Sequence, residues 1–217
     1  MKEIIIFGIG EFSKLLTFLI EKQKTYEILA YTADAKYIDS KTFCNKEIID
    51  FDKLEERFSM QKCEILIAVT QKEMNRQRQI VFERCKKKGY KIASFFDESA
   101  TIDSNCIGEG NIVLFNSYIG PFCTLGKGNI LMENVLVPHY NEIGDFNFLT
   151  NCKLSGNTII KNNCFCGSNS VINNNVVVDD YTLVGAGAYV PKNTEKYSVI
   201  VPARSIVLEG KKSIDLM

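Results

Sequence analysis

The chain has 217 residues, 46% of them hydrophobic, and its 26 Lys and Arg residues balance 26 Asp and Glu residues. A net charge of zero argues against a nucleic-acid binder, because such a protein needs a basic surface to neutralise phosphates. Eight cysteines include no CxxC pair and there is one histidine, so we expect reduced thiols and no metal site.

The chain opens with MKEIIIFGIG, an apolar run that is too short for a signal peptide or a membrane span. We therefore expect a cytoplasmic protein. Strands are then predicted at 3–7, 26–31, 48–50, 63–69 and 90–96, and helices at 11–22, 52–58 and 71–88. On the last helix Met74, Ile80, Val81 and Cys85 are expected to face inward. This alternation predicts a small Rossmann-like parallel α/β domain over residues 1–98.

The first strand leads into the glycine turn Gly8-Ile9-Gly10-Glu11-Phe12-Ser13. A dinucleotide fingerprint has glycine at the third marked position, where this chain has Ser13, so the motif is incomplete. Asp34 follows the second predicted strand, where such domains place a ribose-binding acid. Arg76 and Arg78 could reach phosphates, although a solvated helix face is the favoured interpretation.

A six-residue repeat of large aliphatic residues begins at Ile102. The spacing falls to five at Ile102–Ile107 and at Leu149–Leu154. Asn or Gly usually stands three residues after each aliphatic, where a tight corner needs left-handed backbone, and a small side chain follows it. Three such repeats make one triangular turn, so residues 102–195 are predicted to form a left-handed parallel β-helix. This all-β domain would span 99–217 with a C-terminal tail. A turn-rich β-sandwich would not hold the repeat in register.

The only histidine, His139, lies two residues after the aliphatic Val137. Counting three repeats per turn predicts that the same corner recurs in later turns at Gly156, Asn174 and Lys192. The N–H of Gly156 could then stabilise an oxyanion. Tyr140, Phe146 and Cys152 stand near His139 at corner positions that elsewhere hold Asn or Gly. Such departures from the pattern tend to occur at functional sites. A surface histidine, with aromatics packing between subunits, is the alternative.

Four parts of the chain are informative together: Pro138-His139-Tyr140-Asn141-Glu142-Ile143-Gly144-Asp145, Leu154-Ser155-Gly156-Asn157, Cys166-Gly167 and the α/β domain with Gly8-Ile9-Gly10. They resemble a known family, the hexapeptide sugar acyltransferases that include nucleotide-amino-sugar N-acetyltransferases and sialic acid O-acetyltransferases. The resemblance covers nearly the whole chain.

The resemblance implies an acetyl-CoA-dependent enzyme of bacterial surface-glycan biosynthesis in which His139 is the general base. It implies a homotrimer with acetyl-CoA between subunits, along an edge through Gly156 and Asn174 toward Gly185 and Ala186. The α/β domain would bind the nucleotide of a nucleotide-linked sugar at Gly8, Gly10 and Asp34.

The chain also departs from the family pattern. Tyr140 stands where relatives have an acidic residue that orients the histidine, so Glu142, Asn141 or a neighbouring subunit would have to replace it. A second histidine common in relatives is missing, with Phe148, Asn151 and Cys152 in its place, and Ile200-Val201-Pro202-Ala203 replaces a Gly-x-Pro-Ala motif.

A neutral amine needs less help from a base than a hydroxyl does, which favours N-acetylation over O-acetylation of a sugar. A non-catalytic β-helix that binds a nucleotide sugar is the third hypothesis.

Overall fold

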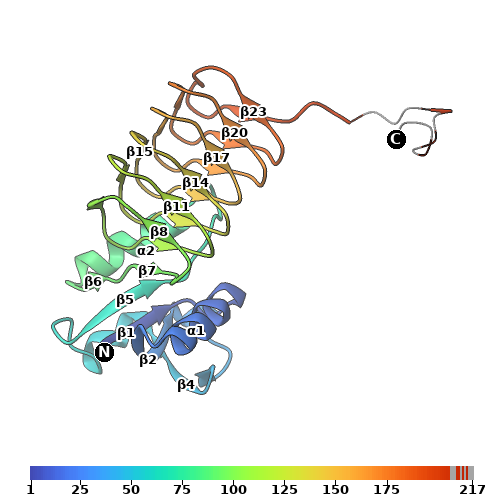
Figure 1. Cartoon of the computed structure of the whole chain (residues 1–217). Helices are drawn as coiled ribbons and strands as arrows, with labels where there is room; N and C mark the ends of the chain where they lie inside the picture. The colour runs from blue at the N-terminus through green and yellow to red at the C-terminus, as the bar shows by residue number, and fades with distance from the viewer. Residues whose placement is uncertain (206–208, 211, 213, 215–217) are drawn as a thin grey trace.

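The computed structural model describes residues 1–205, 209–210, 212 and 214. The chain forms an α/β part followed by a long coil, which rises from it in Figure 1. The elements of the α/β part are β1 (Lys2–Phe7), α1 (Glu11–Gln23), β2 (Tyr26–Ala33), η1 (Ala35–Tyr37), β3 (Thr42–Phe43), β4 (Lys46–Asp50), η2 (Phe51–Glu56), β5 (Cys63–Ile67), α2 (Arg76–Lys87) and β6 (Lys91–Ile92).

The six strands of the α/β part lie in the order β3-β4-β2-β1-β5-β6. All neighbours are parallel except the β3–β4 hairpin. The chain moves outward from β1 in one direction through β2, and in the other through β5. Ligands of such sheets bind where the strand order reverses, beyond the carboxyl ends of the strands. That point here lies between the ends of β1 and β5.

The helix predicted at 71–88 begins only at Arg76. The three preceding residues have left-handed backbone, with φ of 54° at Glu73, 53° at Met74 and 64° at Asn75, so no right-handed helix can include them. The inward face also differs from the prediction. Ile80 is 38% exposed, whereas Arg78 is only 1% exposed.

The coil is a left-handed parallel β-helix whose two-residue strands form three sheets. The first sheet contains β7 (Phe95–Phe96), β10 (Ile112–Val113), β13 (Ile130–Leu131), β16 (Phe148–Leu149), β19 (Phe165–Cys166), β22 (Leu183–Val184) and β24 (Val199–Ile200). The second contains β8 (Thr101–Ile102), β11 (Tyr118–Ile119), β14 (Leu136–Val137), β17 (Lys153–Leu154), β20 (Val171–Ile172) and β23 (Tyr189–Val190). The third contains β9 (Cys106–Ile107), β12 (Thr124–Leu125), β15 (Glu142–Ile143), β18 (Ile159–Ile160) and β21 (Val177–Val178).

The coil begins earlier and ends later than the repeat indicated. The strand predicted at 90–96 is divided between the two parts: β6 pairs with β5, whereas β7 pairs with β10 of the coil. At the other end β24 still pairs with β22. The segments that contain β7 and β24 therefore belong to the coil, although the spacing of their aliphatic residues does not predict this.

The repeating aliphatics fill the inside of the coil together with small residues such as Cys123, Cys164 and Ala188. Cys152 was predicted at a corner but is fully buried in this core, and Asn151 has the left-handed φ of 40° instead. The five-residue repeat moves the corner back by one residue, which explains the difference. Cys106, which the spacing of the small residues predicts inside, is exposed for the same reason: the five-residue repeat puts it at the outward position of β9, in register with the exposed Thr124 and Glu142.

The α/β part packs on the outer side of the first coil sheet. Ile112, Ile130 and Phe148 point outward there and form one buried cluster with Ile4 and Leu16. This apolar contact sets the position of the carboxyl ends of β1 and β5 relative to the coil. Among the described helices, none has the length and apolar character needed to span a membrane.

Candidate active site

His139 lies at the corner that follows β14. Strand register aligns Leu136 with Lys153, Lys153 with Val171, and Val171 with Tyr189. Three residues beyond these positions stand His139, Gly156, Asn174 and Lys192, so the predicted column exists along one edge of the coil. A Cβ placed on Gly156 would be 3.4 Å from His139 Nε2. The imidazole therefore faces the glycine across the space that a side chain would fill.

The backbone of Gly156 is partly open. Its carbonyl accepts the N–H of Asn175 at 3.2 Å, while its own N–H donates to no protein acceptor in the described part of the chain. Its φ lies outside the left-handed region, so glycine is not needed there for backbone reasons. Absence of a side chain instead leaves free space beside Nε2, next to a hydrogen-bond donor that can hold an oxyanion.

Asn141 supports the backbone under His139. Its buried amide donates to Pro138 O at 2.9 Å and to His139 O at 3.3 Å, and it accepts the N–H of Thr158 at 2.8 Å. The Cys123 thiol also donates to Pro138 O. Since these contacts use the Asn141 amide for backbone atoms, it holds the peptide in place and does not orient the imidazole.

Glu142 lies on the outer face of β15, on the next side of the coil, and is exposed. Within the described residues, no hydrogen bond or ion pair joins its carboxylate, or any other, to the imidazole of His139. Glu142 is close to His139 in the sequence, but its carboxylate does not contact the imidazole ring. Within the described residues of a single chain, no contact therefore supports the catalytic role predicted for Glu142.

Two aromatic rings stand beside His139 instead. The ring of Tyr140 is perpendicular to the imidazole, at 90° and 5.6 Å between centroids. It stacks on Phe122 of the preceding turn at 11° and 4.9 Å. Phe122 was missed in the sequence, although it occupies the corner position three residues after Ile119, one turn before Tyr140. Listing every residue at that position would have found it.

Phe146, the second aromatic at a corner, has a structural role. It is 3% exposed and packs edge-on against Phe82 of α2, at 5.3 Å and 82°. Its contact joins the coil to the α/β part of the same chain. The irregular corners near His139 thus have different causes, and Tyr140 is the one that lies at the site.

Gly185 and Ala186 do not lie on the edge that contains His139, and the prediction that they continue it is wrong. They follow β22 of the first sheet, and the N–H of Gly185 donates to Ile200 O at 2.8 Å. A Cβ on Gly167 would be 2.8 Å from Ala186 N, so these residues stack on a different corner. A given edge of the coil recurs every three repeats. Val184 lies only two repeats after Ile172, the aliphatic that precedes Asn174, so Gly185 and Ala186 belong to a different edge.

Gly8 and Gly10 lie in the turn between β1 and α1, at the carboxyl edge of the sheet where the strand order reverses. Gly8 has φ of +124°, and a Cβ on it would be 3.1 Å from Ser13 Oγ and 3.2 Å from Ala68 O. Gly10 precedes α1, and nothing lies within 4 Å of the position of its Cβ. Ser13 is fully buried, and its hydroxyl has no partner among the described residues. At the amino end of α1 the N–H groups of Glu11 and Phe12 donate to no protein acceptor within the described residues, which suits an anionic ligand.

Asp34 lies at the end of β2 and is bound to an arginine. Its carboxylate accepts a hydrogen bond from Arg84 at 2.6 Å. This hydrogen bond raises the pKa of Arg84 above its ordinary value. The guanidinium also lies over the ring of Phe51 at 4.8 Å. Asp34 is therefore one member of an ion pair at the carboxyl end of β2.

Arg78 fits neither interpretation considered for it, since it reaches no solvent and no crevice. Its guanidinium donates to Gly128 O at 2.7 Å, Gly110 O at 2.8 Å and Val69 O at 3.1 Å, and also to Ile67 O. Burial lowers its pKa to about 9, so it stays charged at neutral pH. Arg76 is exposed, as a solvated helix face requires. Arg78 is thus a structural link between β5 and two corners of the coil.

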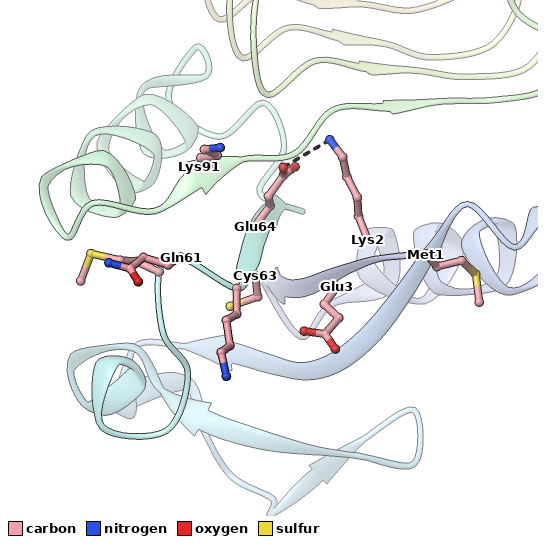
Figure 2. A pocket seen from close by; sticks show the side chains of 9 residues that line it. Met1, Lys2, Glu3, Gln61, Cys63, Glu64 and Lys91 are labelled. Carbon is pink, nitrogen blue, oxygen red and sulfur yellow. Dashed lines mark hydrogen bonds and ion pairs between the residues drawn. The ribbon is translucent and has the colours of Figure 1, made fainter.

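A cavity of about 320 Å³ lies at the opposite end of the α/β sheet from the glycine turn, among the side chains that Figure 2 draws. Met1, Lys2 and Glu3 line it from β1, and Cys63 and Glu64 from β5, with an ion pair of 3.4 Å between Lys2 and Glu64. These residues are at the amino ends of the strands, opposite the edge where such sheets bind ligands. No group of three or more His, Cys, Asp or Glu side chains suited to a metal ion occurs in the described part of the chain.

Solved structures of other proteins have the same fold as this chain over more than nine tenths of its length. No family model matches it. The acetyltransferase domain of PglB from Neisseria gonorrhoeae, in complex with acetyl coenzyme A, has a TM-score of 0.80 at 20% identity, over 93% of this chain and 99% of that one. WeeI from Acinetobacter baumannii has a TM-score of 0.80 at 19% identity, over 92% and 96% of the two chains.

A third similar structure is a histidine-to-alanine variant of GDP-perosamine N-acetyl transferase from Caulobacter crescentus, in complex with CoA and GDP-perosamine. Its TM-score is 0.81 at 19% identity, and the match covers 92% of this chain and 93% of that one. At such identities the comparisons establish that the α/β part and the coil occur together in the same arrangement.

Proposed function

We propose that this chain is an acetyltransferase that transfers the acetyl group of acetyl-CoA to the amino group of a nucleotide-linked sugar, in bacterial surface-glycan biosynthesis. The observation that carries the proposal is the position of His139 Nε2 beside the unhindered backbone of Gly156, whose N–H is free among the described residues. A base and an oxyanion donor on one edge are the two groups that acyl transfer from a thioester requires.

The similar structures support the substrate classes. One has acetyl coenzyme A bound, and another has CoA together with GDP-perosamine. Both share the arrangement of this chain over more than nine tenths of its length. The proposal extends their ligands to this chain on the strength of that arrangement and of the two sites described above.

In the proposed reaction the sugar amine attacks the carbonyl carbon of the thioester, with its nitrogen within reach of His139 Nε2. The new C–N bond forms as the carbonyl oxygen becomes an oxyanion, which the Gly156 N–H stabilises. His139 accepts the proton of the amine. Collapse of the tetrahedral intermediate breaks the C–S bond, and the CoA thiolate leaves and takes up a proton. The products are the N-acetylated sugar and free CoA.

We further propose that acetyl-CoA lies along the edge formed by Gly156 and Asn174, between two chains of a homotrimer. The exposed column fits a ligand that enters from outside the coil, and a neighbouring chain would cover it. The nucleotide of the acceptor would lie at Gly8 and Gly10, beside the first N–H groups of α1, with the Asp34–Arg84 pair at the end of the neighbouring strand β2. Residues 1–98 would thus bind the nucleotide sugar, and residues 99–217 would contain the acetyl-transfer site.

The test is an assay of free thiol release from acetyl-CoA with a panel of UDP- and GDP-linked amino sugars. At least one should give turnover that depends on the acceptor and falls more than a hundredfold in His139→Ala. Sialic acid and nucleotide sugars without an amine belong in the same panel, because they report O-acetylation. Undiminished turnover in His139→Ala would refute the role of His139 as the base. Thiol release at the same rate with and without each acceptor would refute the proposed class of acceptor.

A further inference from the structure

We infer that the stacked rings of Phe122 and Tyr140 position the imidazole of His139 for proton transfer, in place of an orienting carboxylate. The inference rests on the proposed function, since it assigns how the base of that reaction is held. It concerns Tyr140 and Phe122 as positioning residues, which act on His139 and touch neither the acetyl group nor the acceptor.

The geometry confines the imidazole between two surfaces. One is the backbone of Gly156, which Nε2 faces across the space of the missing side chain. The other is the ring of Tyr140, perpendicular to the imidazole at 5.6 Å, within the range that favours edge-to-face aromatic pairs. Tyr140 is itself held by parallel stacking on Phe122 at 4.9 Å. Three rings in series therefore restrict the rotation of a side chain that would otherwise be free on the surface.

No other group within the described residues performs this task. The amide of Asn141 is taken up by backbone atoms, and Glu142 makes no contact with the ring. The Tyr140 hydroxyl also takes part in no hydrogen bond there, so its ring, rather than its polar atom, makes the contact. A base whose orientation is fixed before the substrate arrives loses less entropy in the transition state.

The backbone gives a second, independent observation. Phe122 and Tyr140 have φ of 60° and 56°, a left-handed conformation that bulky residues avoid. The equivalent corner positions that follow in the same column are asparagines with φ of 55° and 59°: Asn157 and Asn175. Among the corners of this column, only those in the turns at and before His139 hold aromatics. Phe146, Tyr181 and Tyr197 have the same backbone in other columns, so it is this backbone together with the position beside His139 that points to function.

The test replaces each ring by the residue that suits the corner. Tyr140→Asn and Phe122→Asn should leave the chain folded and at least as stable, and should lower kcat about tenfold or more, with the KM for acetyl-CoA changed less than twofold. Tyr140→Phe should keep kcat within about twofold, because it retains the ring. Tyr181→Asn is the matched control, since Tyr181 has φ of 58° and stacks on Tyr197 at a corner of the third sheet. It should leave kcat unchanged.

A pH profile separates positioning from general damage. Tyr140→Glu puts a carboxylate beside the imidazole and stabilises its protonated form, so the acidic limb of the kcat profile should move up by about one pH unit. Tyr140→Gln, which adds no charge, should leave the limb in place.

The inference is overturned if wild type is active, His139→Ala is inactive, and both asparagine variants keep the wild-type kcat. It is also overturned if Tyr181→Asn loses as much activity as they do, or if Tyr140→Glu leaves the limb unmoved. A wild-type chain that is inactive with every acceptor, or a fully active His139→Ala, would instead count against the proposed function, so the two failures are distinguishable.

Discussion

The imidazole of His139 faces Gly156 in the next turn, with Nε2 3.4 Å from the point that a Cβ on the glycine would occupy. Three repeats, one of them five residues long, separate the two residues in the sequence and bring them to the same edge of adjacent turns. A methyl group on Gly156 would fill the space between its backbone and Nε2, so the site is sensitive to that single group.

Gly156→Ala should therefore inactivate the chain without unfolding it. The φ of Gly156 suits any residue and a methyl group would meet only ordinary contacts, so the free energy of unfolding should stay within about 1 kcal/mol of wild type. Turnover of acetyl-CoA should fall at least about tenfold, because the methyl occupies the space beside Nε2. Urea unfolding and thiol-release kinetics on the same preparation measure both. An active Gly156→Ala would show that the reacting atoms lie elsewhere.

Gly8→Ala and Gly10→Ala should affect different properties. Gly8 has φ of +124° and its Cβ would press on Ala68 O, so Gly8→Ala should lose about 2 kcal/mol or more of stability. Gly10 has open space around it, so Gly10→Ala should fold normally. Its methyl would instead stand at the proposed nucleotide site and weaken UDP or GDP binding, measured by calorimetry, at least about tenfold. Unchanged nucleotide affinity in Gly10→Ala would place the nucleotide elsewhere.

Arg78→Met should be among the most destabilising single changes in the chain. Four backbone carbonyls would lose their donor, and each buried group left unpaired costs about 1–3 kcal/mol, so we expect a loss of at least about 3 kcal/mol. Arg76→Met on the same helix is exposed and should stay within about 0.5 kcal/mol. Chemical denaturation of both variants is the measurement. Equal stabilities would mean that the buried guanidinium contributes nothing.

Alkaline pH should destabilise the chain through buried thiols. Burial raises the pKa of Cys85 to about 12, whereas the unfolded thiol ionises near its ordinary value of about 8.5. The protonated thiol thus contributes stability that is complete below pH 8.5 and is lost as the pH rises toward 12, at up to about 1.4 kcal/mol per unit. Cys85→Ala should be less stable at pH 8 but have a shallower slope between pH 9 and 11. Parallel urea-unfolding curves for the two proteins would contradict this.

The repeat made most of the coil predictable, because each aliphatic residue reports its own position inside the prism. His139 and Gly156 could be placed in one column by counting residues. The same counting failed where the period changes, because a five-residue repeat leaves open whether the corner residue is Asn151 or Cys152. In the structure Cys152 is buried in the coil core, so Asn151 forms the corner. It also failed for Phe95–Phe96, because this strand has no aliphatic residue at the required spacing.

The candidate site was predictable in its base and only partly in its surroundings. Tyr140 was noticed as an irregular corner, but its partner Phe122 was not, because nothing in a single turn shows that rings of successive turns stack. Assigning Gly185 and Ala186 to the histidine edge was an error of counting that the strand register corrects.

The sequence alone thus determines the repeating part of the structure. A period of six residues stacks equivalent positions of successive turns, so residues three repeats apart become neighbours in space. Contacts between unlike segments follow no period and arise only when the two parts of the chain pack together. Arg78 is the clearest instance, since its acceptors on Gly110 and Gly128 lie 32 and 50 residues away. Its charge suggested a surface, whereas the folded chain surrounds it with carbonyls. Burial and hydrogen bonding between distant segments decide such positions.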